Sequence, residues 1–213
     1  MTHTLFNDRT EAGKRLAKLL DAYRGSNALI LAIPRGGIPV AAAAAHRMRM
    51  DWSIIVARKL PVPWNPEAGF GAVTADGTIV LNEPMVSGLQ LRQTQIDQIA
   101  SDVRMEVQKR TATYMNERPA VEVSGRTVIV LDDGLASGYT MLAAVKAVRL
   151  QNPEKIVAAS PVASRSAARM IEDAADECIF QIVSPSVPFA VADFYVAWRD
   201  LTDDDVIPVL QGA

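Results

Sequence analysis

The chain has 213 residues, a length typical of one compact domain, with 49% apolar and 22% charged residues as in ordinary globular proteins. Its formal net charge of −2 argues against nucleic-acid binding by bulk electrostatics, although a local basic patch is compatible with it. One cysteine and two histidines exclude an internal disulfide framework and argue against a cysteine- or histidine-rich metal centre.

Residues 1–8 lack the apolar stretch of a secretory signal. No apolar run approaches the roughly 20 residues needed to span a bilayer. We therefore expect a cytoplasmic protein that makes no membrane contact.

Helices and strands are expected to alternate, because apolar residues recur either at helical spacing or in short continuous runs. In chain order the sequence predicts a helix over 8–24, a strand over 28–33, a helix over 37–48, a strand over 53–57, a hairpin over 71–74 and 78–81, a helix over 91–114, a strand over 127–131, a helix over 139–150, a strand over 156–159, a helix over 164–175 and a strand over 178–182. The three prolines within 61–66 exclude regular structure in that segment. The alternation is typical of a single α/β domain with a mainly parallel sheet.

Three junctions after expected strands are the most polar, basic or glycine-rich in the chain. They are residues 34–37 (PRGG), 58–59 (RK) and 132–140 (DDGLASGYT). Ligands of open parallel sheets bind beyond the carboxyl ends of the strands. We therefore expect the three junctions to lie together on one rim of the sheet.

The 132–140 junction has the composition of a phosphate-binding loop beside two acids. Its glycines let backbone N–H groups face a ligand, and the start of the following helix favours an anion. The carboxylates of Asp132 and Asp133 suit the hydroxyl groups of an adjacent sugar. Tyr139 stands where a Walker A loop has lysine, which excludes that motif. A plain strand end followed by a turn would have similar residues.

At this junction the chain resembles the type I phosphoribosyltransferases, in which a buried strand ends in two acids before a loop of the form x-x-[T/A/S]-[T/S]-G-x-T. The matching stretch here is VIVLDDGLASGYT, with Ser137 where threonine is usual. Residues 33–37 match the pyrophosphate loop of the family, and 58–59 match its basic pair. The stretch 58–67 and the acidic run 203–206 are most similar to stand-alone members of unassigned acceptor, so the resemblance covers nearly the whole chain.

The resemblance implies a doubly wound, mainly parallel sheet, with a mobile loop and hairpin over 61–83, a long helix over 89–118 and a C-terminal hood over 180–213. It also implies Mg²⁺-dependent transfer of a phosphoribosyl group from phosphoribosyl pyrophosphate to a nitrogenous acceptor, with release of pyrophosphate, by a homodimer. The Mg²⁺ is expected to be held by pyrophosphate, ribose hydroxyls and water, without a protein cage.

The same resemblance assigns roles to individual residues. The catalytic residues it implies are Asp132, Asp133, Lys59, Arg58 and Glu67. The substrate-binding residues it implies are Arg35, Gly36, Gly37, Gly134, Leu135, Ala136, Ser137, Gly138, Tyr139 and Thr140. The acid pair would hold the ribose hydroxyls near the developing positive charge, and the loop 134–140 would anchor the 5′-phosphate. Glu67 either contacts the acceptor or acts as acid or base, or it is a solvated loop acid.

Two other functions compete with this one. A regulator that senses phosphoribosyl pyrophosphate would need the binding fold but not catalysis; Arg58, Lys59 and the 35–37 loop favour the enzyme, because a sensor need not close over leaving pyrophosphate. A dinucleotide-binding oxidoreductase would need a G-x-G-x-x-G junction after a strand, which is missing.

Two features concern the acceptor. The aromatic residues of the hood either stack on an acceptor base or pack in the core; they are Phe189, Phe194, Tyr195 and Trp198. Ala136 stands where the hypoxanthine–guanine branch of the family has an aspartate for the purine nitrogen, and an alanine side chain can neither accept nor donate a proton.

Overall fold

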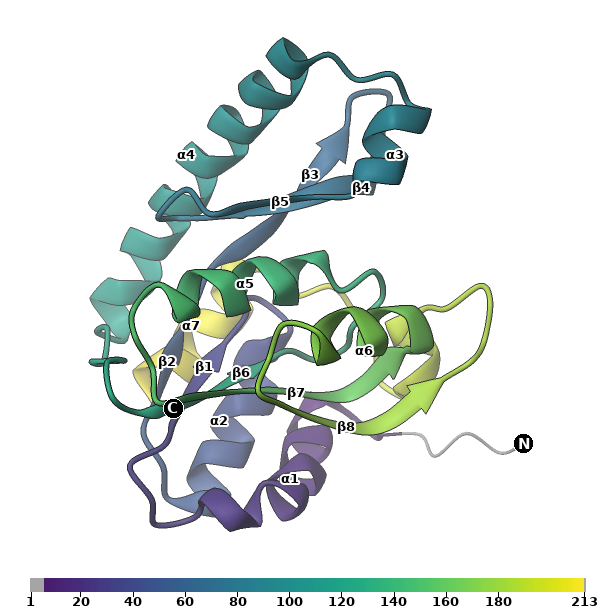
Figure 1. Ribbon diagram of the computed structural model, residues 1–213. Helices are drawn as coiled ribbons and strands as arrows, with labels where there is room; N and C mark the ends of the chain where they lie inside the picture. Colours follow the sequence, from purple (N-terminus) through teal and green to yellow (C-terminus); the bar gives the residue numbers. More distant parts are fainter. Residues whose placement is uncertain (1–5, 213) are drawn as a thin grey trace.

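A computed structural model describes residues 6–212 (Figure 1). Within them, five parallel strands form the central sheet in the order β2-β1-β6-β7-β8. The bounds of these strands are Leu29–Ala32 for β1, Trp52–Ile54 for β2, Thr127–Leu131 for β6, Lys155–Ser164 for β7 and Glu177–Ser184 for β8. The predicted α/β class and mainly parallel sheet are confirmed.

Helices cover both faces of this sheet, with α1 and α2 on one side and α5 and α6 on the other (Figure 1). Their bounds are Arg9–Leu19 for α1, Gly37–Met48 for α2, Tyr139–Arg149 for α5 and Arg165–Glu172 for α6. All four residues of β1 are buried. Ile30 and Ala32 pack in the core on the α2 side, whereas Leu29 and Leu31 pack in the core on the α5 side. Burial on both faces explains why this strand has a continuous apolar sequence.

A second, antiparallel sheet in the order β3-β4-β5 projects from the first and packs against a long helix (Figure 1). We call this sheet, together with the long helix and one short helix, the arm. Its elements are β3 (Ala57–Val62), β4 (Asn65–Thr74), β5 (Ile79–Leu81), α3 (Glu83–Gly88) and α4 (Gln93–Glu117). The β4–β5 connection turns at Gly77 with a φ of 95°, as the predicted hairpin requires.

The prediction that 61–66 is irregular is wrong, since β3 continues through Pro61 and β4 includes Pro66. β3 is an edge strand whose register with β4 shifts on both sides of Pro61. Pro66 lies where β4 has no second partner, because β5 pairs only with residues 71–73. Prolines are tolerated at edges and irregular positions of this kind.

The C-terminal part of the chain folds back over the carboxyl end of the sheet. A 3₁₀ helix, η2 (Val191–Phe194), precedes the last helix, α7 (Asp203–Gln211), and α7 packs on α2 and α4. In the described part of the chain, no helix combines the length and apolarity needed to cross a membrane.

Candidate functional site

Two adjacent carboxylates lie at the carboxyl end of β6 and are almost completely buried. Asp132 exposes 9% of its surface and Asp133 exposes 8%. The backbone N–H of Asp133 donates to Asp132 Oδ1 at 2.8 Å, and Arg9 Nε donates to Asp133 Oδ2 at 2.7 Å. No N–H or hydroxyl group of residues 6–212 reaches the other oxygen of either carboxylate. These two oxygens are therefore free to accept hydrogen bonds from a ligand.

The electrostatics of this acid pair are unfavourable for two full charges. Burial raises the pKa of Asp132 well above its ordinary value, and the neighbouring Asp133 charge raises it further. The positive charge of Arg9 acts in the opposite direction and lowers the pKa of Asp132. Arg9 is thus part of the site, although the sequence motifs do not include it.

Arg9 is held by the C-terminal hood. Its guanidinium lies 4.0 Å from the ring centroid of Trp198 and 5.9 Å from that of Tyr195. Its Nη1 donates to the backbone oxygen of Arg199 at 3.1 Å. The Tyr195 hydroxyl donates to the backbone oxygen of Asp133 at 2.7 Å, so the hood contacts the acid pair both directly and through Arg9.

The hood aromatics pack among themselves and against the N-terminal segment. The ring centroids of Phe189 and Phe194 are 5.5 Å apart, those of Tyr195 and Trp198 are 5.2 Å apart, and those of Tyr195 and Phe6 are 5.4 Å apart. Phe194 and Tyr195 are buried. All four rings therefore take part in packing, and stacking of the partly exposed Phe189 and Trp198 on an acceptor base stays a prediction.

The loop that follows the acid pair presents unused hydrogen-bond donors. Within the described chain, the backbone N–H groups of residues 136–140 donate to no protein acceptor, and neither do the hydroxyl groups of Ser137 and Thr140. Gly138 forms the N-cap of α5 with a left-handed φ of 83°. Tyr139 and Thr140 begin the helix, so its positive end points at the loop. This combination of free amides and a helix N-terminus is suited to an anion.

The first half of the loop is fixed to its surroundings. The backbone oxygen of Leu135 accepts from the backbone N–H of Ser164 at 2.8 Å, and Ser164 Oγ donates to the backbone oxygen of Ala136 at 2.7 Å. A side chain at Gly134 would come within 2.3 Å of Val191 in the hood. The second half of the loop, which holds the unused donors, therefore follows a segment that these contacts fix in place.

The glycine loop after β1 folds directly against the acid pair. A Cβ atom at Gly36 would lie 2.0 Å from Asp133 Oδ2, so only glycine allows this approach. A Cβ atom at Gly37 would likewise come too close to the backbone oxygen of Leu131. The Arg35 side chain is partly exposed, with Nη1 at 3.6 Å from Asp203 Oδ1 of α7. The structure thus brings together two of the three predicted junctions.

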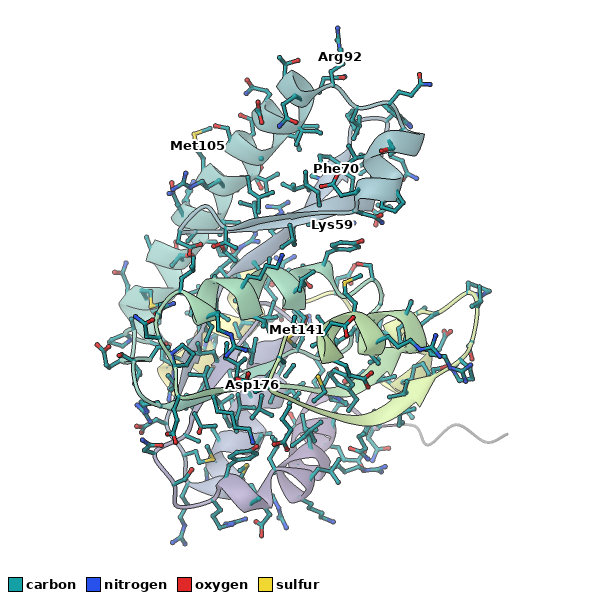
Figure 2. The ribbon with its side chains drawn as sticks, viewed as in Figure 1. Lys59, Phe70, Arg92, Met105, Met141 and Asp176 are labelled. Atoms are coloured by element: carbon teal, nitrogen blue, oxygen red, sulfur yellow. The ribbon has the colours of Figure 1, made fainter. Side chains whose placement is uncertain are left out.

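The third junction follows the end of β2 but lies on the arm, and its approach to the other two junctions stays a prediction. β2 ends at Ile54, and Arg58 and Lys59 lie within β3 of the arm. Arg58 pairs with Glu106 of α4. Lys59 lies on the side of the arm that faces α5 (Figure 2), where its Nζ donates to the backbone oxygen of residue 67 at 2.6 Å. The chain leaves the parallel sheet sooner than the apolar run indicates.

Glu67 lies in β4, near the end of the arm, with 96% of its side chain exposed. Its carboxylate is 4.0 Å from Lys59 Nζ. The predicted catalytic residues therefore form two groups in this structure. The acid pair lies on the main sheet, and Arg58, Lys59 and Glu67 lie on the arm.

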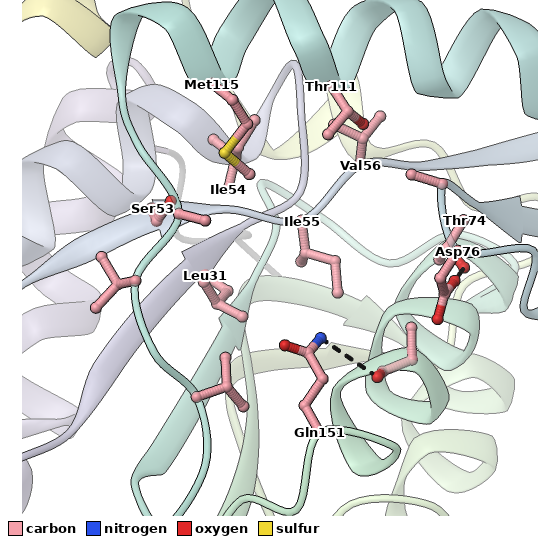
Figure 3. Close-up of a pocket in the computed structure, with 15 residues that line it drawn as sticks. Leu31, Ser53, Ile54, Ile55, Val56, Thr74, Asp76, Thr111, Met115 and Gln151 are labelled. Atoms are coloured by element: carbon pink, nitrogen blue, oxygen red, sulfur yellow. Dashed lines mark hydrogen bonds between the residues drawn. The ribbon is translucent and has the colours of Figure 1, made fainter.

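A mostly apolar cavity of about 170 Å³ lies elsewhere, between β2, α4, α5 and the β4–β5 turn (Figure 3). Leu31, Ile55 and Met115 are among its lining residues. Gln151 also lines it and donates to the backbone oxygen of Ala147 at 3.5 Å. Neither the acid pair nor the 134–140 loop lines this cavity, so it is separate from the candidate site.

An open parallel sheet with a glycine loop, a buried acid pair and an anion-binding loop at one rim is the arrangement of a phosphoribosyltransferase. A family model, the phosphoribosyl transferase domain, matches residues 8–197. The chain therefore belongs to this family.

Similar proteins agree with this assignment. Curated relatives from two strains of Mycobacterium tuberculosis, named as phosphoribosyl transferases, are 34% identical over 209 residues. The match covers 98% of this chain and 47% of each relative, so the chain spans about half the length of these relatives. The crystal structure of TT1426 from Thermus thermophilus is 33% identical, with a TM-score of 0.80 over 98% of both chains. The AQ2163 protein from Aquifex aeolicus shares the fold at 13% identity and a TM-score of 0.51, over 83% of this chain and 74% of its own.

Proposed function

We propose that this chain transfers a phosphoribosyl group from phosphoribosyl pyrophosphate to a nitrogenous acceptor. The observation that carries the proposal is the set of unused N–H and hydroxyl donors over residues 136–140, adjacent to two carboxylates with free oxygens. The donors suit a 5′-phosphate, and the carboxylate oxygens suit the hydroxyls of the ribose attached to it. A homodimer in the cytoplasm is part of the same proposal and rests on the family resemblance.

In this reaction the bond between the anomeric carbon and pyrophosphate breaks, and pyrophosphate leaves with the electron pair. The acceptor nitrogen forms the new bond to carbon and releases its proton to solvent or to a basic group. Positive charge develops at the ribose, so the negative acid pair stabilises it. The backbone N–H groups of Arg35 and Gly36 would hold the pyrophosphate, whereas that of Gly37 donates to the backbone oxygen of Ile33 at 3.0 Å.

A divalent cation fits this site as a companion of the substrate. Mg²⁺ prefers hard oxygen ligands and keeps several waters, and it is usually bound together with substrate phosphates. The negative charge of Asp132 and Asp133, which lie beside the expected position of the ribose hydroxyls, favours a cation there, and the ion would take its ligands from pyrophosphate, ribose hydroxyls and water. When bound with pyrophosphate and the ribose hydroxyls, Mg²⁺ would supply charge neutralisation on the leaving group.

The arm would provide the remaining positive charge. Arg58 and Lys59 are proposed to approach the pyrophosphate when the 61–83 segment closes, which requires Lys59 to leave the backbone oxygen of Glu67. Glu67 is proposed to contact the acceptor. Its high exposure supports a group that is available to a ligand.

The proposal is tested by incubating the protein with phosphoribosyl pyrophosphate, Mg²⁺ and a panel of bases while pyrophosphate release is followed. We expect base-dependent release by the wild type and none by a folded Asp132→Asn/Asp133→Asn double variant. Wild-type release by the double variant would contradict the role of the acid pair. Tight binding of phosphoribosyl pyrophosphate without release for any base would instead support the sensing regulator.

The same panel tests a prediction about the acceptor. Ala136 is exposed on the loop and has no group that can bond a purine nitrogen. We expect little or no activity with hypoxanthine or guanine, because the usual partner of a 6-oxopurine proton is missing. Chromatography of the products decides this, and efficient formation of inosine or guanosine monophosphate would refute it. Adenine- and orotate-type enzymes of the family also lack that acid, so Ala136 does not argue against other bases as acceptors.

A further inference from the structure

Arg9 occupies a position that is unfavourable for a cation. It is the first residue of α1, and a helix N-terminus carries partial positive charge that repels cations. It is also buried, with 8% of its surface exposed, and a buried charge is costly unless it is paired. A cation in such a position needs a compensating negative charge, and here the carboxylate of Asp133 supplies it.

The contact between Arg9 and Asp133 involves only one carboxylate oxygen. Arg9 Nε donates to Oδ2 at 2.7 Å, and Nη1 donates to the backbone oxygen of Arg199. Oδ1 of Asp133 receives no donor from the described chain. Among fully buried side-chain oxygens and nitrogens of residues 6–212, only Gln181 Oε1 lacks a partner, so Oδ1 of Asp133 retains access to solvent.

Neighbouring groups restrict the position of the Arg9 guanidinium. It stacks on Trp198 at 4.0 Å from the ring centroid, while Tyr195 binds the backbone oxygen of the same aspartate. Gly36 lies directly against the same carboxylate, since a Cβ atom there would come within 2.0 Å of Oδ2 and 2.5 Å of Oδ1. Asp133 is thus held by Arg9 at its side chain, by Tyr195 at its backbone and by the close approach of Gly36.

We propose that Arg9 is a positioning residue for the acid pair, which compensates the charge of the buried carboxylates and fixes Asp133 with its free oxygen toward the ribose hydroxyls. This inference rests on the proposed function, because it takes the ribose as the ligand of that oxygen. Arg9 acts through Asp133 and does not itself touch the substrate.

The test compares two ligands by calorimetry on the full chain. Ribose 5-phosphate carries both the phosphate and the hydroxyls, whereas propyl phosphate carries a phosphomonoester without hydroxyls. For Arg9→Gln we expect the affinity for ribose 5-phosphate to fall about 10- to 100-fold, the range for a hydrogen bond to a charged group. The affinity for propyl phosphate should not change, because the 136–140 donors are untouched.

The matched control is Arg15→Gln, on the same helix. Arg15 pairs with Glu11 and lies 5.4 Å from the ring centroid of Phe6, away from the acid pair, so this variant should bind both ligands like the wild type. Equal losses for both ligands in Arg9→Gln, or no loss, would overturn the inference. Thermal melts of each variant show whether it is folded.

If Arg9→Gln does not fold, Arg9→Lys decides the question with the same two ligands. Lysine keeps the charge but cannot reproduce a planar guanidinium stacked on an indole. A selective loss for ribose 5-phosphate supports positioning, and wild-type affinity for both ligands overturns it.

The measurements need no acceptor and no turnover, so they separate two failures. A wild type that binds ribose 5-phosphate but releases no pyrophosphate with any base contradicts the proposed transfer and leaves the role of Arg9 intact. A wild type that does not bind ribose 5-phosphate overturns both.

Discussion

The folded chain stabilises the neutral form of the Asp132 carboxyl group relative to its ionised form. Burial and the neighbouring Asp133 raise its pKa in the folded chain, relative to 3.8 for an ordinary aspartate. The folded chain therefore binds this proton more tightly than the unfolded chain does. Stability from this group is present at acid pH and is lost as the pH rises from the unfolded pKa through the folded one.

This linkage predicts that Asp132→Asn stabilises the protein at neutral pH while it removes activity. The amide keeps an oxygen for the Asp133 N–H but cannot ionise. Each 1 kcal/mol gained should raise the melting temperature by about 2–4 °C in a domain of this size. Thermal melts at about pH 7.5 and about pH 4.5 should show a larger gain at the higher pH. Asp200→Asn, at an exposed site, is the control; an equal gain at both pH values, or a loss at the higher one, would contradict the prediction.

At the residue scale, the sequence predicts the acid pair but not the arginine that holds it. Asp132 and Asp133 end an apolar run and stand next to the loop that they serve, so one local pattern includes both. Arg9 is 124 residues away from Asp133, and no local pattern connects them. Its one local signal is a basic residue in the first turn of a helix, where the helix dipole disfavours it.

Among the elements, the 134–140 loop depends on the backbone conformation of one glycine. Gly138 has a φ of 83°, and a Cβ there would lie 3.1 Å from Ala167 Cβ. We expect Gly138→Val to lower the free energy of unfolding by at least about 1–2 kcal/mol, the cost of a left-handed residue with a Cβ atom. It should also weaken the affinity for ribose 5-phosphate measured by calorimetry, because the loop amides move.

Gly125 provides the matched control for this change. Its φ is 68°, and a Cβ there would meet no atom within 4 Å. Gly125→Val should therefore show a similar loss of stability without a change in ribose 5-phosphate affinity. Unchanged affinity in Gly138→Val would mean that the phosphate binds elsewhere.

The arm makes a second prediction at this scale. If Lys59 contacts charge that develops only as pyrophosphate departs, Lys59→Ala should lower kcat more than it raises KM. Steady-state kinetics with phosphoribosyl pyrophosphate measures both. Lys109→Ala, on the exposed surface of α4, is the control for loss of one positive charge. A pure rise in KM would show that Lys59 binds the substrate and the transition state equally.

Prediction of the elements succeeds where burial dictates the sequence. β6 is predicted over 127–131 and observed with those bounds, because a strand buried on both faces must be apolar throughout. The arm is harder to predict, since its proline-containing strands are stabilised by edge positions and register shifts that only the pairing reveals. α7 is missed because its sequence is short, acidic at the start and contains Pro208, although Thr202 and Asp205 form a capping box.

Over the whole molecule, one carboxylate joins three parts that are distant in sequence. Asp203, in the first turn of α7, accepts a hydrogen bond from the Tyr114 hydroxyl of α4. Its Oδ1 is also 3.6 Å from Arg35 Nη1 in the glycine loop and 3.7 Å from Arg110 Nε. The arm is thereby tied, through α4, to the glycine loop and the C-terminal helix.

A double-mutant cycle on Tyr114 and Asp203 tests this connection. Burial and the neighbouring carboxylate raise the pKa of Tyr114, so its hydroxyl keeps its proton and needs an acceptor. Asp203→Ala leaves that buried donor unpaired and should lower the free energy of unfolding by about 1–3 kcal/mol. The same change should cost less in a Tyr114→Phe background, where no donor remains. Urea denaturation of the four proteins measures the coupling, and losses that simply add would show that the contact does not stabilise the fold.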